Sequence, residues 1–229
     1  MKRLFYLPIL FFLLGNGAVR AQTKTSDGWQ ALFDGKSFNG WRKVAKDSLP
    51  DAGWSTDHGE LTFDPAKGHG TDIITTTSFG NFELSLDFKI SEGGNSGVKY
   101  SLLPNTSLGC EYQIIDDSRH PDAKLGINGN RKTGALYDIL PASVDKPDKG
   151  PGEWNAARII VKGRHVEHWL NGVKILEYEK GSDAFRQAIA ASKFKTTPGF
   201  SDPESSPVLL QAHGDKVQFR NIKIRELQP

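Results

Sequence analysis

The sequence predicts an all-β fold, a jelly-roll β-sandwich with one short helix. Hydrophobic and polar residues alternate along many short segments, which is the pattern of half-buried strands. Glycine- and proline-rich joints separate these segments, with Gly 24 and Pro 12 among 229 residues. Only one segment has helical spacing. A chain with many short strands and a single helix is typical of a sandwich.

The chain begins with the pattern of a secretory signal peptide. Lys2 and Arg3 precede an apolar run over residues 4–14, and small residues stand at Val19 and Ala21. The run is shorter than the roughly 20 apolar residues that span a membrane. We therefore expect cleavage after Ala21, a periplasmic or secreted protein that no longer contacts the membrane, and one domain over residues 22–229.

Removal of this leader changes the interpretation of the charge. The formal charge of +2 falls to −1, because the leader carries three cationic residues. No basic stripe with interleaved aromatic residues is present, so no nucleic-acid partner is expected. The one cysteine, Cys110, excludes a disulfide scaffold and a thiolate zinc site, and is expected to be a buried strand residue. No oligomeric state is predicted.

The elements can be placed along the chain from their periodicity. The clearest strand is Phe82–Ile90, and the Asn171-Gly172 pair predicts a hairpin because both residues accept a positive φ. Further strands are expected at Glu60–Phe63, Ile73–Thr76, Gly97–Leu103, Glu111–Ile115, Ala135–Leu140, Ala156–Lys162, Val166–Leu170, Val173–Glu179, Val208–His213 and Val217–Leu227.

One helix and two long connections complete the predicted layout. The helix is expected from Ser182 to Ala191, with Ser182 as its N-cap and apolar residues spaced i, i+4. The long polar connections are Asp116–Gly134 and Ser192–Pro207. Connections of this length in a compact domain are usually functional rims or disordered segments.

Several predicted strands carry long hydrogen-bonding side chains on one face. Because residues i and i+2 share a face, Glu111 and Gln113 lie opposite Tyr112 and Ile114. If such strands are neighbours, their polar faces merge into one wall of Lys99, Glu111, Gln113, Tyr137, Gln211 and His213. Groups of this kind pair with the vicinal hydroxyls of sugars. The plainer interpretation is a sheet face that meets water.

Other chemistries have less support. A glycosidase with two catalytic carboxyls is not indicated, because Glu111 is followed at i+2 by Gln113, which cannot ionise. No G-x-S-x-G motif is present, so the sequence gives no support for a catalytic Ser–His–Asp triad. His165 and His168 lie on opposite faces of one predicted strand, so they do not form a shared metal site. One polar cluster could hold a cation and consists of Asp116, Asp117, His120 and Asp122. Its spacing matches no calcium loop, and residues of these types commonly cap turns. We expect no metal and no cofactor.

Seven short motifs occur in the order of a known family. They are Leu32-Phe33-Asp34-Gly35 with Gly40-Trp41, Asn95-Ser96-Gly97-Val98-Lys99-Tyr100, Glu111-Tyr112-Gln113-Ile114, Gly134-Ala135-Leu136-Tyr137, Gly152-Glu153-Trp154-Asn155, His168-Trp169-Leu170-Asn171-Gly172, and His213-Gly214 with Phe219-Arg220-Asn221-Ile222. The chain resembles the 3-keto-disaccharide hydrolase domain family over about residues 28–227. The resemblance implies a concanavalin-like jelly roll in exported bacterial proteins that cleave glycosides oxidised to a ketone at C3.

The chemistry that the resemblance implies needs one base rather than two carboxyls. A C3 ketone acidifies the proton on C2, so that a base can form an enolate that expels the C1 substituent, and water adds afterwards. Under this hypothesis His213 or Glu111 is the base, and Lys99 or Arg220 stabilises the enolate oxygen. The substrate-binding residues would be Tyr137 at the leaving group, Gln113 and Gln211 on hydroxyls, and Trp169 against a ring.

Two alternatives remain at this point. A non-catalytic carbohydrate-binding module would use the same polar wall without a base, since sandwiches of this type also bind sugars without cleaving them. An adhesion or interaction domain would instead present an exposed apolar patch. One residue departs from the family pattern, because Ala212 stands before His213 where family members often carry Asp.

Overall fold

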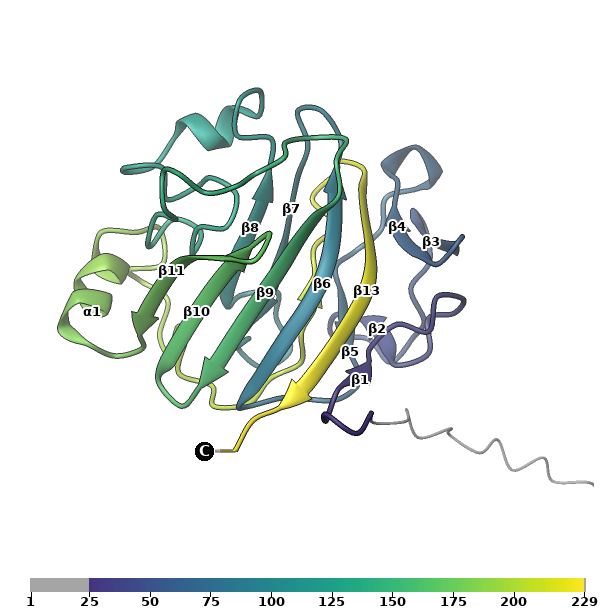
Figure 1. The fold of residues 1–229 in the computed structure, drawn as a ribbon, viewed down its shortest axis with the longest axis horizontal. Coiled ribbons are helices and arrows are strands. Elements are labelled where there is room, and N and C mark those ends of the chain that lie inside the picture. The colour runs from purple at the N-terminus through teal and green to yellow at the C-terminus, as the bar shows by residue number, and fades with distance from the viewer. Residues whose placement is uncertain (1–24, 229) are drawn as a thin grey trace, which may run out of the picture.

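The computed structural model describes residues 25–228, which form two antiparallel sheets packed face to face (Figure 1). The predicted signal peptide lies outside the described residues. The larger sheet has the order β11-β10-β9-β6-β13-β4-β3 with β1 beside β13, and the smaller has the order β2-β5-β12-β7-β8. The strands are β1 (Gln30–Ala31), β2 (Trp41–Lys43), β3 (Trp54–Asp57), β4 (Glu60–Phe63), β5 (Ile73–Thr75), β6 (Phe82–Ile90), β7 (Asn95–Tyr100), β8 (Cys110–Ile115), β9 (Asn155–Lys162), β10 (His165–Leu170), β11 (Val173–Glu179), β12 (Leu209–Leu210) and β13 (Val217–Glu226). This architecture confirms the predicted all-β sandwich.

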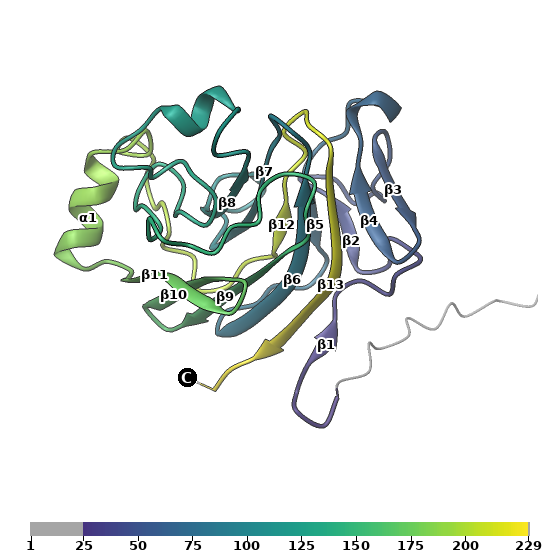
Figure 2. The same cartoon turned by 45° about the horizontal axis from the view of Figure 1, so that its top comes forward.

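The helical elements are few and lie outside the sheets. The α-helix α1 (Asp183–Ala190) follows β11 (Figure 2). Its N-cap is Ser182, as predicted, and Ser182 Oγ accepts the backbone N–H of Phe185 at 3.2 Å. Two 3₁₀ turns are η1 (Pro65–Lys67) and η2 (Pro121–Lys124). Within residues 25–228, no helix has the length and apolar character needed to cross a membrane.

One hydrophobic core fills the space between the sheets. The alternate residues of β6, from Phe82 to Ile90, are at most 3% exposed, and they pack with the inward residues of the smaller sheet. Those inward residues include Val98, Tyr112 and Ile114. Cys110 is also fully buried in this core, and burial raises the pKa of its thiol to about 11. The prediction of a buried strand cysteine is confirmed.

Local backbone geometry explains where several strands begin and end. Asn171 and Gly172 both have positive φ, at 47° and 85°, and join β10 to β11 as the predicted hairpin. Ser101 has a φ of 48°, which ends β7 at Tyr100 instead of the predicted Leu103. The last strand is irregular, because the pairing of β13 with β6 shifts register between Arg220 and Lys223.

Two further predicted strands are wrong in extent or type. Residues 135–140 form turns in which Leu136 N donates to Leu140 O, and Asp138 has a φ of 63°, so the segment is not a strand. It nevertheless borders β8, because Tyr137 N donates to Glu111 O at 3.0 Å. The strand predicted over 208–213 shortens to β12. The prediction missed β1, β2 and β3, which span two to four residues and are too short for a clear alternation.

A buried polar chain links the two sheets. Tyr178 and Tyr100 share a hydrogen bond of 2.8 Å, and Tyr100 Oη lies 2.6 Å from His168 Nε2. His168 Nδ1 lies 2.9 Å from the carbonyl of Gly134, so a neutral ring that donates from Nδ1 and accepts at Nε2 satisfies both contacts. The side chain is fully buried, and this burial lowers the pKa of His168 to about 4.

This histidine makes stability depend on pH. Between pH 6.5 and about 4 the unfolded chain binds a proton that the folded chain does not, so the free energy of unfolding falls as the pH falls. His168→Gln keeps one donor and one acceptor but does not titrate. Between pH 7.5 and 5, urea unfolding should show wild type losing about 2 kcal/mol more than the variant. Parallel pH profiles would contradict the assignment.

Candidate functional site

The outer face of the smaller sheet, turned away from the core, is polar and yet buried. Lys99 on β7 is paired with Glu111 on β8, and Gly97 is paired with Gln113. Lys99, Glu111 and Gln113 are 9%, 6% and 1% exposed. The plainer interpretation of a face in contact with water is therefore wrong, because loops cover it.

All six residues of the predicted polar wall line one pocket on this face. They are Lys99, Glu111, Gln113, Tyr137, Gln211 and His213. The pocket is also bordered by Asn95, Lys193, Phe194 and residues 107–109. Its volume is about 100 Å³, which is smaller than the roughly 300–1,000 Å³ of most small-molecule sites. The six residues that strand alternation grouped together therefore line one cavity.

An ion pair between Glu111 and Lys99 lies in this pocket. Glu111 Oε2 is 3.3 Å from Lys99 Nζ, and both side chains are nearly inaccessible. Burial raises the pKa of Glu111, whereas the cations of Lys99 and Lys193 oppose that rise. A carboxyl whose pKa is raised toward neutrality is well suited to accept a proton.

Two glutamines add hydrogen-bonding groups to the pocket. With its amide turned so that both atoms find partners, Gln113 donates to Ser96 O at 3.0 Å and to Glu111 Oε1 at 3.2 Å. Gln211 Oε1 is buried and has no hydrogen-bond partner among the described residues. A buried acceptor without a partner costs about 1–3 kcal/mol, which a bound hydroxyl group would recover.

Tyr137 carries its ring into the pocket but directs its proton elsewhere. Its hydroxyl donates to Asp122 Oδ2 at 2.8 Å, and Asp122 is also paired with Arg131 at 2.7 Å. Burial and the Asp122 carboxylate raise the pKa of Tyr137 well above its usual value. The hydroxyl is thus a poor acid, and the predicted donation to a leaving group is not supported. A lone pair and the ring remain for substrate contact.

Sequence reasoning missed Lys193, a second cation in the pocket. It follows α1 in the connection over 192–207, which the sequence marked as a candidate rim without singling out a residue. Its Nζ lies 4.1 Å from the centre of the Tyr137 ring, and its backbone N–H donates to Asp138 Oδ2 at 2.7 Å. Desolvation lowers the pKa of Lys193, opposed by the Glu111 and Asp138 carboxylates.

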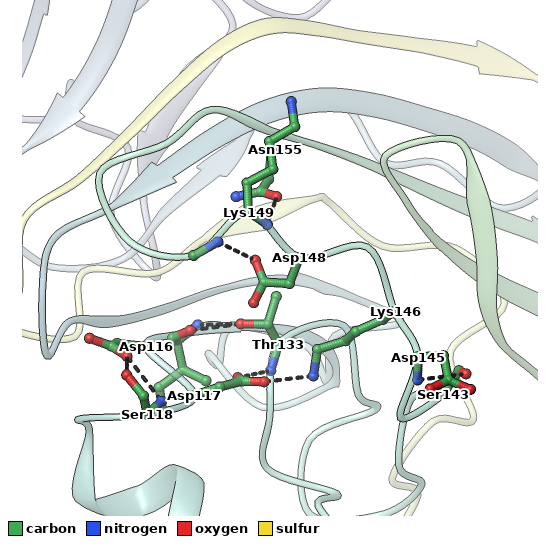
Figure 3. A network of polar contacts seen from close by, with 12 residues as sticks. Asp116, Asp117, Ser118, Thr133, Ser143, Asp145, Lys146, Asp148, Lys149 and Asn155 are labelled. Carbon is green, nitrogen blue, oxygen red and sulfur yellow. Dashed lines mark hydrogen bonds and ion pairs between the residues drawn. The ribbon is translucent and has the colours of Figure 1, made fainter.

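The loop that carries Tyr137 is fixed by polar contacts rather than by a strand. Asp116 accepts hydrogen bonds from Gly93, Ser118 and Arg119, and these contacts lower its pKa to about 2 although burial opposes the shift. Asp117 accepts from Thr133 N and pairs with Lys146 at 2.6 Å (Figure 3). These residues cap turns, so the candidate cation cluster at Asp116, Asp117, His120 and Asp122 does not converge.

Two other groups among the described residues could hold a metal ion by proximity. His120, His213 and Asp215 offer ligand atoms within 4.8 Å of one another. His120 Nδ1, however, accepts the backbone N–H of Asp122 at 3.1 Å, so the neutral ring carries its hydrogen on Nε2 and faces the group as a donor. The second group contains His165, Glu167 and Glu177, where Lys174 already pairs with both glutamates. Neither arrangement is that of a metal ligand set.

Two of the predicted site residues lie on the opposite side of the sandwich. The centre of the Trp169 ring, on β10, lies 3.9 Å from Arg158 Cζ. Arg220 Cζ, on β13, lies 4.0 Å from the centre of the Trp154 ring. Both alternate with core residues of the larger sheet and so face outward from it. The hypothesis that they bind substrate in the pocket is therefore wrong. Strand alternation shows that a residue faces outward, but it does not show to which of the two sheets the residue belongs. His165 and His168 face opposite sides of β10, as predicted.

Comparison with known proteins agrees with this architecture. A 3-keto-disaccharide hydrolase of Bacteroides thetaiotaomicron is 37% identical, with coverage of 88% of this chain and 79% of the relative. The crystal structure of a proposed glycosyl hydrolase from Parabacteroides distasonis superimposes with a TM-score of 0.78 at 32% identity, covering 88% of this chain and 95% of that one. A second such structure from this species gives a TM-score of 0.63 at 32% identity, with 82% and 99% coverage. Residues 28–225 match the 3-keto-alpha-glucoside-1,2-lyase-like domain, and the chain belongs to that family.

Proposed function

We propose that the protein cleaves glycosides and disaccharides whose sugar carries a ketone at C3, by elimination across C1 and C2 followed by addition of water. The observation that carries this proposal is the convergence in one pocket of one carboxylate, two lysines and the hydrogen-bonding side chains of Gln113, Tyr137, Gln211 and His213. Family membership and the curated relative's name support a sugar as the substrate. The signal-peptide pattern at residues 1–21 favours action outside the cytoplasm.

The set of ionisable groups favours elimination over the two-carboxylate mechanism. Among the residues that line the pocket, Glu111 is the one carboxylate. Inverting and retaining glycosidases need a second carboxyl, about 5–10 Å from the first. Elimination from a 3-keto sugar needs one base and a positive environment for the enolate oxygen. Lys99 and Lys193 supply that environment, and Lys193 replaces Arg220 in this role.

Each bond change can be assigned to a group in the pocket. Glu111 removes the proton from C2, and the electrons of that bond form the C2–C3 double bond of an enolate whose oxygen faces Lys99 or Lys193. Return of these electrons restores the ketone, forms the C1–C2 double bond and breaks the bond from C1 to the leaving oxygen, which takes the proton that Glu111 removed from C2. Water then adds across C1 and C2. As Glu111 becomes neutral, negative charge moves to the substrate oxygen while the lysines remain cationic, so the net charge of the site is unchanged.

Removal of the base should stop the reaction. Glu111→Gln keeps the size of the side chain but cannot accept the proton, so aglycone release from a 3-keto-glucoside should fall about 10²- to 10⁴-fold. His213→Asn should lower the rate about tenfold or less, because His213 is exposed at the rim. Full activity of Glu111→Gln with complete loss in His213→Asn would assign the base to His213.

The pH profile provides a separate check on the base. Glu111 acts in its ionised form, so kcat/KM should rise with pH, with a midpoint above the ordinary glutamate value because burial raises this pKa. The acidic limb should persist in His213→Asn, measured as aglycone release between pH 4 and 8. Loss of the limb in that variant would contradict the role of Glu111.

Gly97 gives a steric test of the position of the carboxylate. A Cβ at this residue would lie 2.4 Å from Glu111 Oε1, so Gly97→Ala should displace the carboxylate and lower kcat/KM about 100-fold. Since both changes act through one group, Gly97→Ala should cost little in a Glu111→Gln background. An additive loss in the double variant, or unaltered activity in the single one, would show that Glu111 is not the group affected.

An exchange experiment separates an enzyme from a carbohydrate-binding module. In deuterated water the protein should catalyse exchange of the C2 proton of 3-keto-glucose, followed by NMR, and Glu111→Gln should not. A binding module would bind unoxidised glucosides without catalysing exchange. Tight binding of the unoxidised sugar together with no exchange would favour the module.

A further inference from the structure

At one edge of the pocket lies a second polar cluster, formed by His120, His213 and Asp215. His213 belongs both to the pocket lining and to this cluster, so the two are continuous. Asp215 lies in the turn between β12 and β13, and its Oδ2 accepts the backbone N–H of Asn95, another lining residue, at 3.0 Å. The cluster is therefore attached to the pocket wall and remains open to solvent.

The cluster presents donors and acceptors that no described residue uses. His120 Nδ1 is occupied by the Asp122 N–H, which places the ring hydrogen on Nε2. Within residues 25–228, no hydrogen bond or ion pair reaches His120 Nε2, either ring nitrogen of His213, or Asp215 Oδ1. The edge thus offers a fixed N–H donor, a fixed carboxylate acceptor and an imidazole between them. Gln211 Oε1, also unpartnered, lies in the adjoining pocket.

Another part of the pocket lining has a different chemistry. Leu108 and Phe194 give it an apolar edge, and Leu108 is 44% exposed. An aromatic leaving group would suit that apolar edge, whereas a leaving group with several hydroxyls would need alternating donors and acceptors. The edge at His120, His213 and Asp215 offers both, on ligand atoms within 4.8 Å of one another.

We infer that this cluster is a second sugar subsite, which holds the leaving sugar of a 3-keto-disaccharide by its hydroxyl groups; the inference rests on the proposed function. Asp215 Oδ1 accepts from one hydroxyl, His120 Nε2 donates to another, and His213 contacts the ring between the two subsites. The cluster therefore sets a preference for disaccharides over glycosides with apolar aglycones.

Two conservative variants test this inference while retaining the local fold. His120→Asn keeps an oxygen that can cap η2 but removes the Nε2 donor. Asp215→Asn can still accept from Asn95 N through its amide oxygen, while the free acceptor becomes a donor. Asp47→Asn, at an exposed residue outside the pocket lining, is the matched control for the charge change.

The measurement compares two substrates with the same linkage, a 3-keto-glucosyl-glucose and a 4-nitrophenyl 3-keto-glucoside. Each variant should lower kcat/KM for the disaccharide about tenfold, through KM, and leave the nitrophenyl substrate within about twofold. Equal losses on both substrates, or none on either, would overturn the subsite. Stoichiometric binding of Zn²⁺ or Mn²⁺ in calorimetry, lost in both variants, would also overturn it. If wild type cleaves neither substrate, the proposed function itself fails.

Discussion

The site depends on an ion pair that the fold holds away from water. Glu111 and Lys99 face each other across β7 and β8 on the outer side of the smaller sheet, and both are nearly inaccessible. A buried charge without a partner is strongly unfavourable, so each of these residues requires the other. Gly97 completes the arrangement, because any side chain there would occupy the space of the carboxylate. The protein thus places a carboxyl with a raised pKa beside the amino group of Lys99.

The covering loops make this burial possible, and each loop is fixed by contacts of its own. The connection between β8 and β9 is tied down by Asp116 and Asp117 and bordered by the backbone of β8 (Figures 1 and 3). The buried His168 supports the same connection from within the core, because its ring bonds to Gly134 O. A single chain of contacts therefore runs from the middle of the sandwich to Tyr137 in the pocket. Loss of any one of these contacts should disturb the pocket before the sheets themselves unfold.

Strand alternation predicted much of this arrangement, for a reason that also sets its limit. A strand packed on one side must alternate, so Phe82–Ile90 and Val173–Glu179 were predicted with their observed bounds. Alternation also assigned Glu111 and Gln113 to the same face. It failed at residues 135–140, where the chain forms turns with isolated bridges at Leu136 and Leu140, and at β1, β2 and β3, which are too short to show a period.

Parity has a second limit in a sandwich, since each of the two sheets has an outer face. The hypothesis that follows from the family resemblance placed Arg220 and Trp169 against the substrate, but both face outward from the larger sheet, and only pairing between distant strands shows which sheet carries a residue. Lys193 lies outside any regular element, so no periodicity could place it.

In the proposed reaction Lys193, and not Arg220, faces the enolate oxygen, and this difference changes the electrostatics of the site. Arg220 is paired with Asp87 at 3.2 Å, whereas no carboxylate among the described residues forms an ion pair with Lys193. With Lys99 and Lys193 opposite a single carboxylate, the pocket lining carries an excess of positive charge. That excess disfavours an oxocarbenium ion, the cationic species that ordinary glycosidases stabilise. It favours an enolate, and so a substrate that has already been oxidised at C3.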